Sequence, residues 1–268
     1  MKRTFSSEFL YQVFALIIAV IIVHAIYVTV VRPQATAIIA EQTLRIQEDE
    51  NYTPDRSLYV LVRDFEQESC FVLMLWALAI MGYKAVKAAG ERKLLQEDLV
   101  PVNSGVRILP EDTREYARTI QSLPDTVRVM LLPRVLLSSL ERFGSTRNVQ
   151  DVSSVANTLC ESEGERLESE LSMIRYIAWA IPSVGFIGTV RGIGEALGQA
   201  HRAVDGDIAG VTQSLGTAFN STFIALLISI FVMFLVHQLQ LMQERQVFDT
   251  QTYIDHNLIR HMQAHGGA

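Results

Sequence analysis

The sequence predicts an all-α membrane protein with four transmembrane helices and long cytoplasmic helical extensions. Hydrophobic residues make up 49% of the chain and the mean hydropathy is +0.22, although 19% of the residues are charged. The apolar residues are concentrated in four runs, and the charged residues lie between these runs. A hydrocarbon core about 30 Å thick needs roughly 20 residues of helix, so each run can cross a membrane if its polar flanks occupy the interfaces.

The first span is predicted within residues 1–31, which include the N-terminus. This run is too long for a signal-peptide core and has no small-x-small cleavage pattern, which favours a retained helix. His24 lies within it, and we interpret it as a packed or interface-facing imidazole. Residues 32–69 form an outer, periplasmic loop. The second span covers residues 70–88, with Lys84 extending its charged end to the interface.

The remaining chain is predicted to alternate between cytoplasm and membrane. Residues 89–172 form a cytoplasmic helical domain that includes helices at 125–143 and 148–171. The third span covers residues 173–198, a periplasmic turn covers 199–207, and the fourth span covers 208–236. Residues 237–268 form a cytoplasmic C-terminal helix that packs against the cytoplasmic helices.

Basic residues near the span ends predict that both termini are cytoplasmic. Lys2 and Arg3 precede the first span, and Lys84, Lys87 and Arg92 follow the second, where the positive-inside rule places such residues in the cytoplasm. The net charge of −6 comes without any basic block, which argues against a nucleic-acid partner. The two cysteines show no zinc-like spacing and no disulfide framework.

The third span carries a stripe of small residues. Pro182, Gly185, Gly188 and Gly192 share one helical face, which permits close approach of a neighbouring helix. Packing alone does not account for Thr189 beside them, since alanine would pack equally tightly. Arg191 and Glu195, spaced i,i+4 near the outer end, are predicted to form an interfacial ion pair.

The fourth span carries a polar stripe in its outer half, formed by Ser214, Thr217, Asn220 and Ser221. Because an amide has no partner in lipid, this stripe predicts either one wall of a hydrated ion path or hydrogen bonds between helices. Neither residues 176–190 nor residues 208–236 contain a carboxylate. A proton path here would therefore need a carboxylate from another chain.

Two strings carry a resemblance to a known family. PSVGFIGTVRGI, from Pro182 to Ile193, resembles the MotA/TolQ/ExbB signature P-x-x-G-x-x-G-T-V-x-G-I. LGTAFNSTFIALLI, from Leu215 to Ile228, is similar to the family's next span, and Thr217 takes the place of its pore-facing threonine. Arg191 and the pair Asn220–Ser221 depart from the usual pattern, so the resemblance leaves ion choice and gating open. The four-span layout is MotA-like.

The resemblance implies a pore or stator subunit of an ion-driven motor in the bacterial inner membrane. Such subunits form pentamers around two copies of a MotB/TolR/ExbD-like single-span partner, whose helix carries the essential aspartate. Thr189 and Thr217 would line the ion path, extended by Asn220, Ser221 and Ser214. Proton coupling is expected, with sodium as the alternative, and no cofactor or metal is implied.

Two other classes compete with this interpretation. A non-conducting membrane scaffold, which recruits a partner through its cytoplasmic helices, would need helix packing but no hydroxyl stripe. An enzyme is not expected, because the glycines of GFIGTVRGIG have dinucleotide-loop spacing but no strand precedes them.

Overall fold

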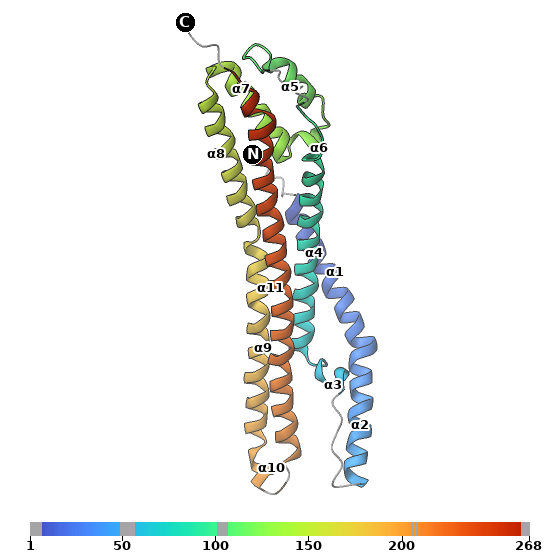
Figure 1. Cartoon of the computed structure of the whole chain (residues 1–268). Helices are drawn as coiled ribbons and strands as arrows, with labels where there is room; N and C mark the ends of the chain where they lie inside the picture. The colour runs from blue at the N-terminus through green and yellow to red at the C-terminus, as the bar shows by residue number, and fades with distance from the viewer. Residues whose placement is uncertain (1–6, 49–56, 101–106, 205, 207, 264–268) are drawn as a thin grey trace, which may run out of the picture. The chain divides into compact units, whose positions relative to one another are not determined.

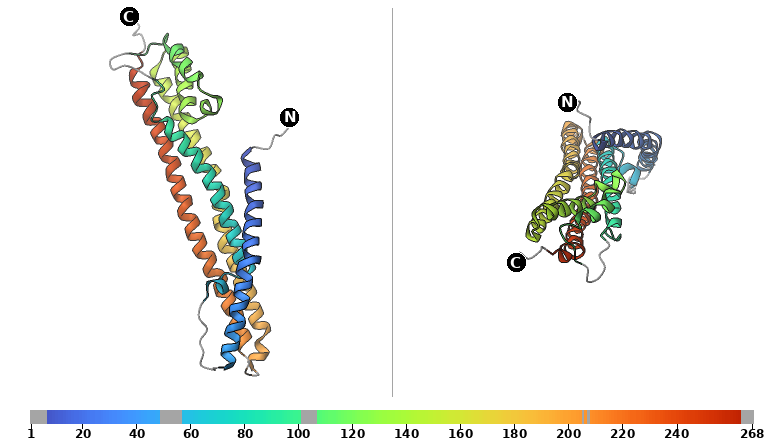
Figure 2. Two further views of the ribbon diagram at one scale, coloured as in Figure 1. Left: turned by 90° about the vertical axis from the view of Figure 1, so that its right-hand side faces the viewer. Right: turned by 90° about the horizontal axis from the view of Figure 1, so that it is seen from above.

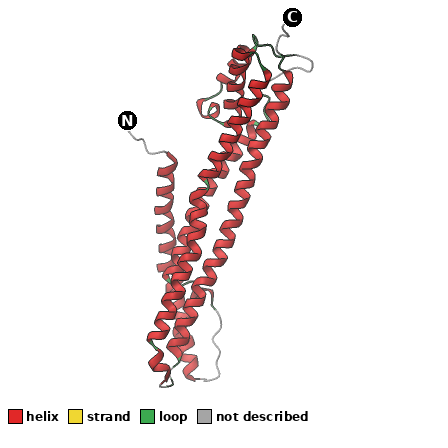
Figure 3. Ribbon diagram, turned by 90° about the vertical axis from the view of Figure 1, so that its left-hand side faces the viewer, coloured by secondary structure: helices red, strands yellow, loops and turns green. Residues whose placement is uncertain are grey.

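The computed structural model describes residues 7–48, 57–100, 107–204, 206 and 208–263. These residues form helices and connecting loops, and none of them belongs to a strand (Figure 3). Four helical stretches among them are long and apolar enough to cross a membrane, namely Glu8–Ile46, Phe65–Leu94, Val149–Gly198 and Ala209–His261. The predicted all-α membrane fold is confirmed. Lys2 and Arg3, which contributed to the predicted orientation, lie outside the described residues.

The chain divides into two compact units. Unit 1 comprises Met1–Gly82 and Met173–Val236, and unit 2 comprises Tyr83–Ser172 and His237–Ala268. The first therefore holds most of the apolar runs, and the second holds most of the charged segments.

Unit 1 begins with a helix that continues into the predicted outer loop as far as Glu48. Helix α1 (Ser7–Ile26) passes through a π-helical segment η1 (Tyr27–Val31) into α2 (Arg32–Glu48), and the ribbon is unbroken (Figures 1 and 2). The sequence analysis ended this helix at residue 31. Pro33 lacks an N–H and crowds the carbonyl of residue 29, and the π-helical segment around that carbonyl accommodates it without a break.

The other membrane helices of unit 1 extend beyond their predicted limits. A short helix α3 (Leu58–Leu61) lies in the predicted loop, and α4 spans Phe65–Leu94, longer at both ends than the predicted 70–88. Acidic residues in its first turn and basic residues in its last turn complement the helix dipole. Helix α9 covers Ser172–Gly198, α10 covers Ala200–Val204 in the predicted turn, and α11 covers Ala209–Asn257.

Unit 2 packs its helices around an apolar core of its own. It contains α5 (Thr113–Gln121), α6 (Asp125–Arg128), α7 (Leu131–Thr146), α8 (Val149–Glu170) and the ends of α4 and α11. Leu136, Leu140 and Phe143 of α7 are fully buried with Val152 of α8 and Ile254 of α11. The C-terminal part of α11 thus packs against α7 and α8, the helices that the sequence analysis expects in the cytoplasm. A 3-10 turn, η2 (Ile259–His261), follows it.

The prediction of a single helix over residues 125–143 is wrong. The structure divides it into α6 and α7, with Val129 and Met130 between them. Pro133 explains the division. In a continuous helix residue 133 would donate a backbone hydrogen bond to the carbonyl of Val129, and proline has no N–H to donate. In the first turn of α7 the same proline is tolerated, since that N–H has no intrahelical partner there.

Candidate functional site

The small residues of α9 face α11 at very short range. A Cβ atom built on Gly185 would lie 2.3 Å from the Ala225 Cβ, and one on Gly188 would lie 2.6 Å from the Ser221 Cβ. At Gly192 the corresponding distance to the Ala218 Cβ is 2.7 Å. These distances are too short for real side chains, so only glycine allows the two helices to approach this closely. Pro182, one turn before Gly185, is half-buried within the same helix.

Hydroxyl groups cross the same helix contact. Thr189 Oγ1 donates to the Ala218 carbonyl oxygen at 3.1 Å and contacts the Thr222 hydroxyl. Thr222 Oγ1 donates to the Gly185 carbonyl oxygen at 3.0 Å. The Thr189 hydroxyl, assigned to the ion path from sequence, is therefore used between α9 and α11. Thr222 was missed, although it lies one turn after Ala218 and faces α9 with it.

The predicted stripe of α11 divides into two kinds of residue. Ser221 is 1% exposed; it donates to the Thr217 carbonyl oxygen at 3.0 Å and accepts from Gln67 Nε2 at 3.3 Å. Ser214 is also buried and accepts from Gln199 Nε2 at 3.2 Å.

Thr217 and Asn220 behave differently. Both are half-buried, and within the described ranges neither the Thr217 hydroxyl nor the Asn220 amide has a hydrogen-bond partner. These two side chains are thus the polar groups of the stripe that a further chain or water could contact.

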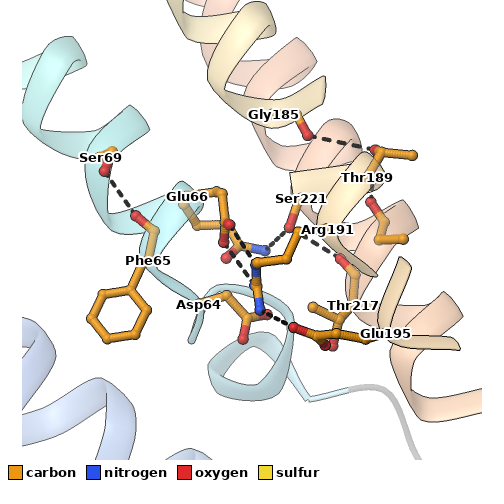
Figure 4. Close-up of polar contacts among 12 residues, drawn as sticks. Asp64, Phe65, Glu66, Ser69, Gly185, Thr189, Arg191, Glu195, Thr217 and Ser221 are labelled. Atoms are coloured by element: carbon orange, nitrogen blue, oxygen red, sulfur yellow. Dashed lines mark hydrogen bonds and ion pairs between the residues drawn. The ribbon is translucent and has the colours of Figure 1, made fainter. Parts of the chain in front are cut away.

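Arg191 joins α9 to the first turn of α4 (Figure 4). Its Nε and Nη2 atoms donate to the two carboxylate oxygens of Glu66 at 2.7 and 2.9 Å, and its Nη1 donates to Glu195 Oε1 at 2.8 Å. The sequence analysis named Glu195 but missed Glu66, which makes the two-pronged contact. The planar guanidinium fits a carboxylate in this way, so the pair fixes the start of α4 against α9.

Asp64 lies just before α4, outside the membrane-spanning segments, and belongs to the same charged group (Figure 4). Its side chain is 18% exposed and lies 3.6 Å from Arg63 Nε. Burial raises the pKa of Asp64, because it disfavours the charged carboxylate, while Arg63 and Arg191 act in the opposite direction.

A second charged group ties the first helix to α4. Glu68, which is 8% exposed, accepts from Arg32 with one oxygen and lies 2.7 Å from His24 Nδ1 with the other. The Arg32 guanidinium also lies over the Phe65 ring, 4.4 Å from its centroid. His24, interpreted from sequence as a packed or interface-facing imidazole, is therefore a partner of a buried carboxylate. The carboxylate of this pair is buried, whereas the His24 side chain is 59% exposed, and such pairing lowers the cost of placing an ionisable group within a membrane segment.

Among the described residues, no group of three or more His, Cys, Asp or Glu side chains is placed to hold a metal ion. Cys70 and Cys160 are both free and buried. The arrangement around α9 and α11 offers hydroxyl, amide and carbonyl groups, which can hydrogen-bond to water or coordinate a cation through their oxygen atoms.

Comparison with known families decides the identity of this helix pair. The sequence model of the MotA/TolQ/ExbB proton channel family matches residues 130–252, which include α8, α9 and most of α11. Residues 130–252, a little under half of the chain, belong to the MotA/TolQ/ExbB proton channel family. The comparisons with curated proteins and with solved structures gave no match.

The family match agrees with the four apolar helices, and together they indicate a multi-pass membrane protein. Proteins of the MotA/TolQ/ExbB family are ion-driven subunits that energise motion or transport and work with partner proteins in membranes. The matched segment contains every residue predicted to line the ion path. Gln67, Glu66 and Glu68 lie outside it, on α4.

Proposed function

We propose that this chain is the pore or stator subunit of a proton-driven motor in the bacterial inner membrane, and that it is not an enzyme. Five copies would surround a dimer of a MotB/TolR/ExbD-like single-span partner, with both termini of the chain in the cytoplasm. The family match and the MotA-like layout of four apolar helices support this proposal. Sodium is the alternative ion.

The observation that carries the proposal is the pair Thr217 and Asn220. They are half-buried on a helix that crosses the membrane, and no described residue hydrogen-bonds their side chains. A polar group facing lipid costs several kcal/mol in free energy, on the order of what a whole hydrogen bond contributes in an apolar medium. Contact with a partner helix and with water in an ion path would remove that cost.

The carboxylate that takes up the proton would come from the partner. Residues 208–236 contain no Asp or Glu. Glu66 approaches the site from α4, but both of its oxygens already bind Arg191. Thr217 and Asn220 would then offer oxygen atoms to the partner's aspartate or to the water beside it.

Thr217→Val tests the proposal, because valine keeps the side-chain volume and removes the hydroxyl. The chain would be purified with its co-expressed partner, placed in liposomes, and its proton flux measured with a pH-sensitive dye. We expect the flux to fall at least about tenfold, on the order of one lost hydrogen bond in the path, while assembly is unchanged. Thr212→Val is the matched control, since that hydroxyl donates to the Ile208 carbonyl of its own helix.

A non-conducting scaffold is the second candidate, and the position of Thr189 favours it. The Thr189 hydroxyl is already bonded between α9 and α11, so packing accounts for it without an ion path. Normal activity and assembly of Thr217→Val would support the scaffold and contradict the motor. Thr189→Val is the weaker test, because it changes the helix contact as well.

A further inference from the structure

The first turn of α4 places a glutamine inside unit 1. Gln67 is 0% exposed, and its Nε2 donates to the Leu61 carbonyl oxygen at 3.1 Å and to Ser221 Oγ at 3.3 Å. A carbonyl oxygen can only accept, so the contact with Leu61 fixes which end of the amide is the nitrogen. The amide oxygen, Oε1, is buried and has no hydrogen-bond partner among the described residues.

The two neighbouring carboxylates are already occupied. Glu66 binds Arg191 with both oxygens, and Glu68 binds Arg32 and His24. In this turn, as far as the described residues show, Gln67 Oε1 is the side-chain acceptor left for another group.

Ser221 connects the amide nitrogen of Gln67 to α11, the helix that carries the candidate ion path. It receives the Gln67 amide hydrogen and donates its own hydrogen to the Thr217 carbonyl oxygen at 3.0 Å. A hydrogen-bonded series thus leads from the α3 backbone through Gln67 and Ser221 to the backbone carbonyl of Thr217. Buried acceptors without a protein partner are rare, and they usually receive a hydrogen bond from water or a ligand.

We propose that Gln67 is a further lining residue of the ion path, whose Oε1 accepts a hydrogen bond from the water that carries a proton past Ser221. The same oxygen would bind a sodium ion if sodium is the coupled ion. This inference rests on the proposed function, and it adds α4 to the two helices that the family signature covers.

Two substitutions test the role of the oxygen. Gln67→Leu removes it, whereas Gln67→Glu keeps an acceptor and adds a titratable group. Proton flux and, separately, sodium flux would be measured in liposomes that contain the chain and its co-purified partner. We expect Gln67→Leu to lower the flux of the coupled ion about tenfold. Gln67→Glu should retain flux and acquire an additional pH dependence beyond that of the native protein, an effect that a purely structural role would not produce.

Two controls make the outcome decisive. Gln243→Leu is the same change at another buried glutamine, which is 4% exposed and belongs to unit 2, and its flux should be native. Thr217→Val reports on the proposed function itself.

If Thr217→Val loses flux but Gln67→Leu conducts normally in an intact assembly, the role of Gln67 is overturned and the proposed function stands. If Gln67→Leu fails to assemble and Gln67→Glu has native pH dependence, Gln67 is structural. Normal flux in Thr217→Val overturns both.

Discussion

At the scale of single residues, the close contact between α9 and α11 predicts that a glycine at this contact cannot be replaced without loss of stability. In Gly185→Ala the new methyl group would lie 2.3 Å from the Ala225 Cβ, so the helices must separate, at a cost of about 1–3 kcal/mol in the free energy of unfolding. Gly194→Ala is the matched control: its Cβ would meet nothing within 4 Å, and it should gain about 0.5–1 kcal/mol from helix propensity. Unfolding in detergent measures both. Equal stabilities would contradict the close contact.

Asp64 gives a prediction about pH. Burial raises the pKa of Asp64 above its usual 3.8, so the folded chain keeps a proton that the unfolded chain has already released. Stability is therefore lost as the pH rises through the raised pKa. Asp64→Asn removes this loss, and its advantage over the native chain should grow as the pH rises above about 4. Parallel pH profiles of the two proteins would show that Asp64 titrates normally.

Sequence reasoning found some site residues and missed others for identifiable reasons. Thr217 and Asn220 could be identified from the sequence because a polar residue within an apolar run is visible there. Glu66 and Gln67 were not, because their partners Arg191 and Ser221 lie 125 and 154 residues away. Periodicity within one helix says nothing about which distant helix covers it. The acidic start of α4 was the available signal.

At the scale of helices, α7 depends on a carboxylate from another element. Its N-cap residue, Met130, supplies no side-chain cap, and Glu91 of α4 instead accepts from the Leu131 N–H at 3.2 Å and from Gln246 Nε2 at 2.6 Å. Glu91→Leu leaves both donors unpaired, so we expect about 1–3 kcal/mol of lost stability in unit 2. Hydrogen exchange in the first turn of α7 should accelerate.

The control for Glu91 is Glu161→Leu, at an exposed position on α8. It should change the free energy of unfolding by less than about 0.5 kcal/mol. Protection of the Leu131 amide that is unchanged in Glu91→Leu would contradict the cap. No sequence signal identified it, since the usual capping residues are adjacent to the helix they cap, whereas Glu91 is 40 residues away.

Element boundaries also show where sequence patterns are insufficient. The first span was ended at residue 31, two residues before Pro33, yet the helix continues because a π-helical segment precedes the proline. Proline at residue 133 was passed over, yet a new helix begins two residues before it. A proline thus signals a local problem, and the surrounding packing decides whether the chain bends, breaks or continues.

At the scale of the whole molecule, the predicted orientation can be tested by cysteine labelling. Native Cys70 and Cys160 are 0% and 1% exposed, so the intact native protein should not react with a membrane-impermeant maleimide. In whole cells Glu41→Cys, exposed on α2, should react because the predicted loop faces outward, and Glu161→Cys should react only after lysis. The reverse labelling pattern would show that the predicted topology is inverted.

The account's central claim is that Thr217 and Asn220 face an ion path shared with a partner chain. A cryo-EM reconstruction of the chain purified with its co-expressed genomic neighbours tests this most directly. We predict several copies of the chain around partner helices, with an acidic residue of the partner opposite Thr217. A monomer or dimer in which Thr217 and Asn220 meet lipid or ordinary helix contacts would contradict the account and favour a membrane scaffold.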